Sequence, residues 1–245
     1  MKHKKSINLT SYKNFAIIEK YYSTRALFIS GPSYPSKKNR IINHTQKTAI
    51  FVDFENLRIG VFNKTWKKKR LFFDYNNNPQ KVVDFCNLCV FDSYYERDLL
   101  NLYRIFFYTA KPLDSHSKKK DILNFLSTLE CLNHTALRLG KLVKRGDVEV
   151  QKQVDMLLGI DMLEISLKHF VEKVVLIGYD SDMSPALKLA RTNGIQTEII
   201  LFEDLEQKIE SSLTKHCDFI KKVRIEDIYN KLGIKNDNII NRCSE

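Results

Sequence analysis

Two short apolar runs in this chain end abruptly in acidic residues, and this feature most constrains the fold. Residues 50–52 lead directly into Asp53, and residues 174–177 are followed closely by Asp180 and Asp182. Short runs of β-branched, aromatic and aliphatic residues are typical of buried strands. Open α/β sheets place their functional groups outside the carboxyl ends of parallel strands. The two runs therefore predict a parallel sheet with acidic side chains along one edge.

Strand-like and helix-like segments alternate along most of the chain. We expect strands at residues 48–52, 102–108, 135–143, 173–177 and 196–202. We expect helices at residues 56–63, 79–92, 118–132, 149–170, 183–193, 206–219 and 225–232. This alternation predicts an α/β fold, a three-layer α/β/α sandwich with a mostly parallel central sheet. Neither a GxGxxG nor a GxxxxGK[ST] motif is present, which argues against dinucleotide-binding and P-loop proteins.

Composition favours a soluble globular domain with an extension. The chain has 245 residues, of which 43% are hydrophobic and 28% are charged. No apolar run approaches the roughly 18 residues of a membrane span, and no signal peptide opens the chain. The five cysteines are odd in number and loosely spread, which favours a reducing compartment. We therefore expect a cytoplasmic protein without a membrane partner, and Cys86 and Cys89 as neighbours on a helix rather than zinc ligands.

The positive charge is concentrated at the start of the chain. The net charge is +11, and residues 1–47 carry +9 of it, from eight Lys, two Arg and one Glu. Such an arm can attract phosphate backbones or anionic membrane surfaces. A solvated extension and a targeting segment are the alternatives that the sequence leaves open.

The strand-end acids predict a divalent-metal site, because converging carboxylates repel one another unless a cation neutralises them. Asp53 also suits the N-cap of the following helix, and both roles are compatible. Glu55 and Asn56 follow it and can add ligands or orient water. Asp180 and Asp182 lie two residues apart in a turn, where both can approach one cation or one can cap the next helix.

Two further acids lie on the predicted helix 149–170. Asp155 lies near its start and can reach the strand ends, and Asp161 follows six residues later. Six residues correspond to about 600° of rotation, so the two side chains face roughly 120° apart. They cannot both point straight at one metal ion. A site role and a structural role with a hydrogen-bonded partner stay open for Asp161.

Three motifs in order resemble the NYN domain, in the LabA-like branch of the PIN-domain nuclease superfamily. Residues 51–57 resemble its opening DxxN motif, and residues 152–163 resemble its K-x-V-D-x-x-L-x-x-D-x-L helix. Residues 176–187 resemble its SGDSDF-x-P-L turn, with two departures. Tyr179 before the first aspartate either is an insertion or shifts the turn by one residue, and Met183 stands where the family has Phe.

The resemblance covers about residues 48–202 and implies a ribonuclease that depends on Mg²⁺ or Mn²⁺ and acts on RNA. It implies four catalytic and metal-binding carboxylates, Asp53, Asp155, Asp180 and Asp182. It implies three residues that orient ligands or contact the substrate, Asn56, Ser181 and Lys152. Residues 67–70, with Phe72, Phe73 and Tyr75, either meet the RNA or form surface charge and packing. Self-association to a homo-oligomer is left open.

We predict a basic N-terminal arm and linker at residues 1–47, an NYN/PIN-like nuclease domain at 48–220 and a C-terminal helical tail at 221–245. Two alternatives to a nuclease remain, because a fold does not fix a function. One is a catalytically silent RNA-binding module. The other is a metal-dependent enzyme that acts on a small substrate.

Overall fold

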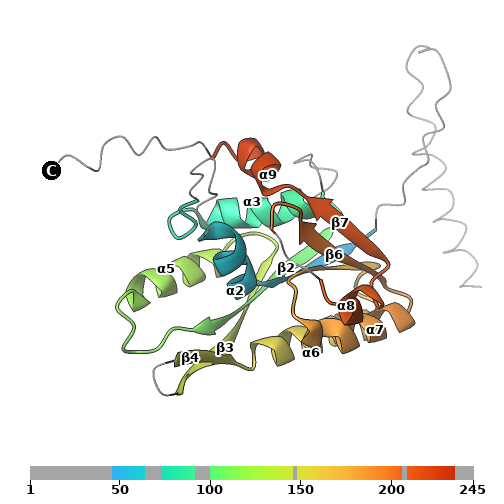
Figure 1. Ribbon diagram of the computed structural model, residues 1–245, viewed down its shortest axis with the longest axis horizontal. Helices are drawn as coiled ribbons and strands as arrows, with labels where there is room; N and C mark the ends of the chain where they lie inside the picture. Colours follow the sequence, from blue (N-terminus) through green and yellow to red (C-terminus); the bar gives the residue numbers. More distant parts are fainter. Residues whose placement is uncertain (1–45, 64–72, 92–99, 146–147, 206–208, 235–245) are drawn as a thin grey trace, which may run out of the picture. The chain divides into compact units, whose positions relative to one another are not determined.

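A twisted sheet with the strand order β4-β3-β2-β1-β5-β6-β7 lies at the centre of the computed structural model (Figure 1). The structure describes residues 46–63, 73–91, 100–145, 148–205 and 209–234, all within one compact unit. The strands are β1 (Thr48–Asp53), β2 (Leu102–Lys111), β3 (Thr135–Arg145), β4 (Val148–Lys152), β5 (Lys173–Ile177), β6 (Gln196–Phe202) and β7 (Phe219–Val223). All neighbouring strands pair in parallel except β3 and β4.

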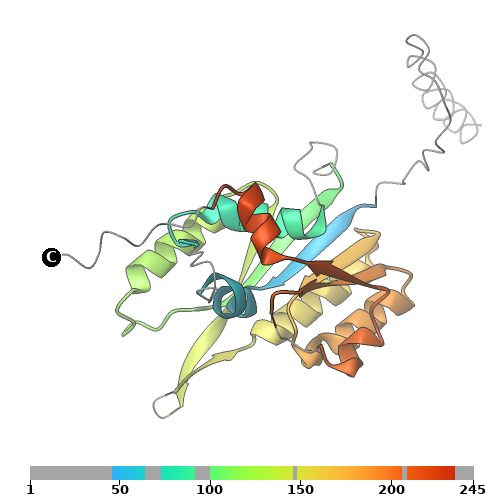
Figure 2. The same cartoon turned by 45° about the horizontal axis from the view of Figure 1, so that its top comes forward.

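Helices cover both faces of this sheet, which confirms the predicted α/β sandwich (Figure 2). One face carries α2 (Phe54–Leu57), the π-helical turn η1 (Arg58–Phe62), α3 (Pro79–Val90), α5 (Lys119–Glu130) and α9 (Ile225–Lys231). The other carries α6 (Val154–Leu167), the 3₁₀ turn η2 (Ser181–Met183), α7 (Ser184–Thr192) and α8 (Ser211–Thr214). No helix within the described ranges is both long and apolar enough to cross a membrane.

The central strand β1 is buried on both faces of the sheet. Ile50 and Val52 pack into the core on the α3 side, while Ala49 and Phe51 pack into the core on the α6 side. Successive side chains of a strand point to opposite faces, so a strand covered on both sides needs a continuous apolar run. This requirement explains why β1 is recognisable in the sequence.

The register of the central strands sets the level at which the acidic residues leave the sheet. Val52 is paired with Phe107 of β2 and with Ile177 at the end of β5. Asp53 is therefore the last residue of β1, and the chain after Ile177 begins beside it. The carboxyl ends of β1 and β5 meet at one edge, as the sequence predicts.

The predicted helix at residues 149–170 starts later than expected. Val148–Lys152 instead forms β4, which pairs antiparallel with β3. The chain then reverses at Gln153, which has a φ of 71°, and α6 begins at Val154. Valines alternate with polar residues in this segment. Such alternation is typical of a strand and not of a helix, which explains why the helical prediction was wrong here.

The predicted helix at residues 206–219 is also corrected. Within the described part of this segment, α8 spans only Ser211–Thr214, and the chain continues into the edge strand β7. The boundary expected at residue 220 falls inside β7. Beyond it, α9 packs into the core through Ile225, Ile228 and Tyr229.

Gly140 of β3 lets the turn before α6 lie directly against the sheet. A Cβ atom at this position would lie 2.5 Å from the backbone oxygen of Lys152 and 2.6 Å from Cγ2 of Val154. Only glycine permits such an approach of one backbone to another. Because this turn starts the helix that carries Asp155, Gly140 helps to fix the place of that carboxylate.

We expect Gly140→Ala to lower the free energy of unfolding by about 1–3 kcal/mol, because the added methyl group meets backbone atoms that must shift. Urea denaturation followed by circular dichroism measures the change. Gly159→Ala is the matched control, since nothing lies within 4 Å of its added Cβ in α6. That variant should gain about 0.5–1 kcal/mol from helix propensity. A Gly140→Ala protein as stable as wild type would contradict the role of this glycine.

Candidate active site

Asp53 ends β1 and caps α2. Its side chain is only 9% exposed. Oδ1 accepts a hydrogen bond of 3.1 Å from the backbone N–H of Asn56, and Oδ2 accepts one from the Asn56 side-chain amide. Burial raises the pKa of Asp53, the two bonds from Asn56 lower it, and the negative charges of Asp155 and Asp180 raise it further. Asp53 is thus both the last residue of β1 and the N-cap of α2.

The turn after β5 lies against Asp53 because residue 178 is glycine. A Cβ at Gly178 would lie 3.1 Å from the Cβ of Asp53. The next residue, Tyr179, turns away into the core on the α3 side, where its hydroxyl accepts a 3.2 Å hydrogen bond from the backbone N–H of Phe202. Tyr179, which departs from the family motif, thus packs against the core, and the chain returns to the edge of the sheet at Asp180.

Asp180 and Asp182 flank the start of η2. Oδ1 of Asp180 accepts a 2.9 Å hydrogen bond from the backbone N–H of Asp182, so Asp180 is the cap of this turn. Asp182 is exposed, and Ser181 between them is half-buried. Met183 is buried in the core on the α6 side, where an apolar residue is required.

Asp155 lies in the first turn of α6 and is exposed. Loss of hydration beside the surrounding protein raises the pKa of Asp155, although its surface is exposed, and the nearby charges of Asp180 and Asp182 raise it as well. Lys152, also exposed, ends β4 three residues earlier. The structure therefore brings carboxylates from three separate segments of the chain to one edge of the sheet.

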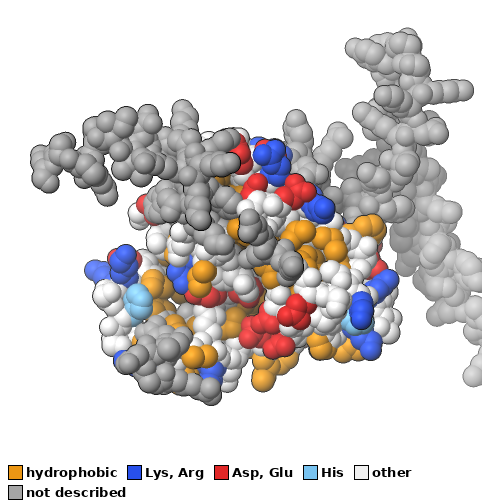
Figure 3. All heavy atoms as spheres, viewed as in Figure 1, with side chains coloured by type: hydrophobic (Ala, Val, Ile, Leu, Met, Phe, Trp, Pro, Cys, Tyr) orange, Lys and Arg blue, Asp and Glu red, His pale blue; other side chains and the backbone are white. Residues whose placement is uncertain are grey.

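Figure 3 shows Asp and Glu side chains gathered above the start of α6. Their charges act on one another, since the pKa of Asp53 responds to Asp155 and Asp180, and that of Asp155 responds to Asp180 and Asp182. Among the residues that the structure describes, no three acidic, His or Cys side chains are already gathered as metal ligands. Asp53 and Asp180 instead face amide groups of their own turns. The four carboxylates share an edge but do not form a closed coordination sphere.

A groove of about 350 Å³ runs beside these carboxylates. It is lined by Asp53, Glu55, Asn56, Ile59, Gly60, Gln151 and Asp155. Ile59, Gly60 and Gln151 were not singled out from the sequence, because only the fold brings them to the groove. Glu55 lies two residues after the end of β1, and its Oε2 accepts a 2.9 Å hydrogen bond from Nε of Arg58, three residues later.

Asp161 lies outside this group and has partners of its own. Oδ2 of Asp161 accepts hydrogen bonds from the hydroxyl of Tyr108 (3.0 Å) and from Nε of Arg138 (2.7 Å). These contacts tie α6 to β2 and β3. Of the two roles that the sequence leaves open for Asp161, the geometry supports the structural one.

The aromatic residues beside the predicted insertion pack into the protein. Phe73 contacts Phe62 and Tyr229, and Tyr75 contacts Phe54 and Phe125. Both are buried, so the packing alternative holds for them. The basic residues 67–70 and Phe72 lie outside the described residues, as does nearly all of the arm at 1–47. Cys86 and Cys89 are buried on α3, which confirms that they are neighbours on a helix.

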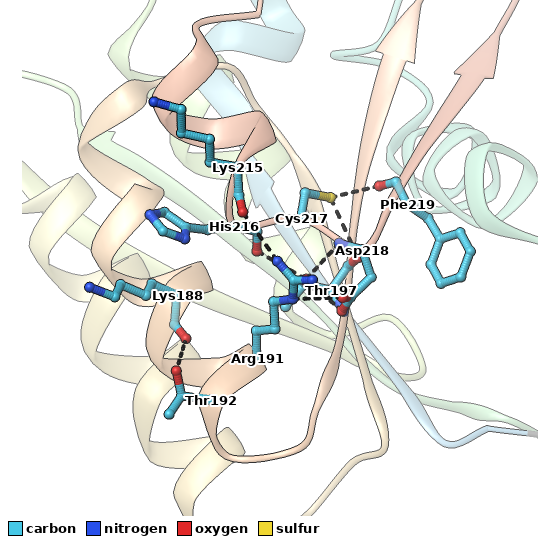
Figure 4. A network of polar contacts seen from close by, with 9 residues as sticks. All are labelled: Lys188, Arg191, Thr192, Thr197, Lys215, His216, Cys217, Asp218 and Phe219. Atoms are coloured by element: carbon cyan, nitrogen blue, oxygen red, sulfur yellow. Dashed lines mark hydrogen bonds and ion pairs between the residues drawn. The ribbon is translucent and has the colours of Figure 1, made fainter.

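A second polar network lies at the opposite ends of the strands (Figure 4). Asp218, just before β7, pairs with Arg191 of α7 at 2.8 Å and accepts hydrogen bonds from both the backbone and the hydroxyl of Thr197. The backbone N–H of Asp218 in turn donates to the Thr197 hydroxyl. These contacts hold the edge strand β7 on β6, which explains a polar cluster far along the strands from the carboxylates.

The chain matches the NYN domain over residues 47–226. It belongs to this family, which is part of the PIN-like nuclease superfamily. The match continues past residue 202 and includes β7, beyond the reach of the three motifs. The assignment to the LabA-like branch stays a prediction.

Comparisons with individual proteins add little detail. No curated protein matches the chain. Among solved structures, a protein of unknown function from Vibrio parahaemolyticus is similar, with 18% sequence identity and a TM-score of 0.47. The similarity covers 74% of this chain and 94% of that chain.

We expect Asp161→Asn to lower the free energy of unfolding by about 1–3 kcal/mol, because Arg138 loses its charged partner and the hydrogen bond of Tyr108 loses its ionised acceptor. Thermal and urea denaturation measure the loss. Glu164→Gln on the same helix is the control, since the Glu164–Lys168 pair is half exposed and worth little. Equal stability of the two variants would argue against the structural role of Asp161.

We expect Asp53→Asn to stabilise the protein in EDTA, increasingly as pH rises. Burial raises the folded-state pKa of Asp53 above 3.8. The stability linked to its proton is fully present below the unfolded-state pKa and is lost as pH rises through the folded-state pKa. The uncharged amide of the variant has no such loss, so its advantage should grow as pH rises above 3.8 and through the raised folded-state pKa of Asp53. Urea titrations at several pH values measure it.

Asp114→Asn is the control, because its effect on stability should change with pH in the opposite direction. Asp114 is exposed, and its hydrogen bond with Lys119 lowers the pKa of that carboxyl. Wild type should therefore gain slightly over this variant as pH rises through the same range. An Asp53→Asn protein that is less stable than wild type at neutral pH would contradict the costly burial of Asp53.

Proposed function

We propose that the protein is a ribonuclease that depends on Mg²⁺ or Mn²⁺ and hydrolyses phosphodiester bonds in RNA. One observation carries the proposal: Asp53, Asp155, Asp180 and Asp182 come from three chain segments to one edge, where burial and mutual repulsion raise the pKa of two of them. Such a group destabilises the fold unless a cation neutralises it. Family membership in the PIN-like nuclease superfamily supports the same chemistry.

The residues present suit a hard divalent cation. Carboxylate oxygens are the ligands that Mg²⁺ and Mn²⁺ prefer. When bound, such an ion lowers the pKa of a coordinated water and stabilises negative charge on phosphate oxygens. Asp53, Asp155, Asp180 and Asp182 would hold it.

The chain's other residues would orient these ligands and the substrate. Asn56 fixes the Asp53 carboxylate through two hydrogen bonds, as outer partners of metal ligands do. Lys152 carries an exposed positive charge three residues before Asp155, where it would contact an RNA phosphate. Ser181 offers a half-buried hydroxyl between two of the carboxylates. RNA as the partner, a cytoplasmic location and self-association are parts of this proposal that experiments must test.

Cleavage of labelled single-stranded RNA and DNA, with Mg²⁺, Mn²⁺ or EDTA, tests the proposal. We expect wild type to cut RNA only with metal, and Asp155→Asn to lose at least about 100-fold in rate, a loss typical of removing one charged group from such a centre. Glu164→Gln, the same kind of change elsewhere on α6, should cut as wild type does. Full activity of Asp155→Asn would place the chemistry elsewhere.

Two further readouts separate the alternatives. A metal that binds the folded state raises the melting temperature, and this rise should be lost in Asp53→Asn. Wild type that binds RNA in a salt-sensitive manner but never cuts it would favour the catalytically silent module. Absence of RNA binding, with metal-induced stabilisation retained, would favour an enzyme of small substrates.

A further inference from the structure

A second cavity, of about 520 Å³, lies directly beside the carboxylate groove. The two share Glu55 and Gln151 in their linings. Thr109 near the carboxyl end of β2 and Leu142 of β3 also line the second cavity. It therefore lies outside the same edge of the sheet as the carboxylates, displaced toward β2 and β3. A strand whose phosphate lies over the carboxylates can place a neighbouring group in it.

The apolar part of this cavity is a rigid aromatic cluster. Phe54, Tyr75 and Phe125 all line it and pack on one another, with ring centroids 5.5 to 6.1 Å apart. All three side chains are buried, so the wall is fixed by the core behind it. Such a wall suits a flat, apolar-faced ligand better than a flexible one.

The polar part of the cavity consists mainly of neutral groups with unused hydrogen-bonding capacity. The side-chain amides of Asn63, Asn76 and Gln151 line the cavity and make no hydrogen bond within the part of the chain that the structure describes. Nδ1 of His116 accepts a 3.1 Å hydrogen bond from the backbone N–H of Lys118. The neutral ring therefore carries its proton on Nε2, which is a donor.

The charges of the described residues that line the cavity balance, so this part of the lining does not favour an anionic ligand. Glu55 and Asp74 line it together with Arg58 and Lys118. Arg58 is already engaged by Glu55 through both Nε and Nη2. Among the described lining residues, a phosphate or carboxylate would find no free guanidinium. Amides, each with a donor and an acceptor, instead match the edge of a nucleobase.

We propose that this cavity receives one unpaired nucleobase of the RNA strand next to the phosphodiester bond that is cut. The aromatic wall contacts its face or edge, and Asn63, Gln151 and His116 hydrogen-bond to its polar edge. The proposal rests on the ribonuclease function proposed above. It makes the protein selective for single-stranded RNA with a preferred base at one position.

Binding of RNA with one abasic nucleotide tests this proposal without requiring cleavage. Asp155→Asn serves as the background, and fluorescence anisotropy gives its affinity for a set of RNAs in which the abasic position moves along one sequence. We expect a single position at which loss of the base weakens binding by about fivefold to tenfold. Asn63→Ala in the same background should weaken binding of the intact RNA to a similar extent, and should add little to the loss at that position.

The control is Asn124→Ala, which removes an amide from an exposed position of α5 that does not line the cavity. It should leave the affinity and the abasic profile unchanged. A flat abasic profile, additive losses in Asn63→Ala, or an equal effect of Asn124→Ala would overturn the base cavity. Failure of the ribonuclease proposal would show separately, as an absence of metal-dependent cleavage by wild type.

Discussion

The cost of burying an ionised carboxylate at the end of the central strand is the constraint on which the site depends. β1 is enclosed by β2 and β5 and by helices on both faces, so Asp53 cannot turn freely into water. Two hydrogen bonds from Asn56 offset part of this cost, and the charges of Asp155 and Asp180 add to it. The fold therefore stores an electrostatic penalty at one point of its edge, where a cation would relieve it.

Small residues set the distances over which this penalty acts. Gly178 lets the turn after β5 contact Asp53, and Gly140 lets the turn before α6 contact β3. A larger side chain at either place would push one carboxylate-bearing segment away from the edge. Tyr179 performs the complementary task, because its ring is held in the core and the turn is thereby fixed. Close backbone packing thus brings the carboxylates near enough to repel one another.

Much of the scaffold, and the convergence of Asp53, Asp155, Asp180 and Asp182 at one edge, could be predicted from the sequence because the central strands are buried on both faces. β1 and β5 leave continuous apolar runs that end in acids, and Asp155 begins a helix. β4 and β7 were not predicted, since short edge strands carry polar residues and resemble helix segments. The partners of Asp161 were not predictable either, because Tyr108 and Arg138 come from two different strands. The second cavity has no local pattern, since its amides come from the end of η1, a turn and β4.

The acidic edge and the neutral cavity beside it suggest how RNA can bind where the protein itself repels it. Four carboxylates oppose a phosphate backbone by Coulomb repulsion, so affinity at the groove requires a neutralising cation. A cavity whose described lining residues carry balanced charges would not add to that repulsion, and hydrogen bonds to a base there would depend little on salt. Hydrogen bonds to one base would hold the strand in register, while the cation makes the adjacent phosphate acceptable to the carboxylates. The cavity would then set the position of the RNA strand, and the carboxylate groove with its cation would neutralise charge at the phosphodiester bond. The cavity and the groove share Glu55 and Gln151.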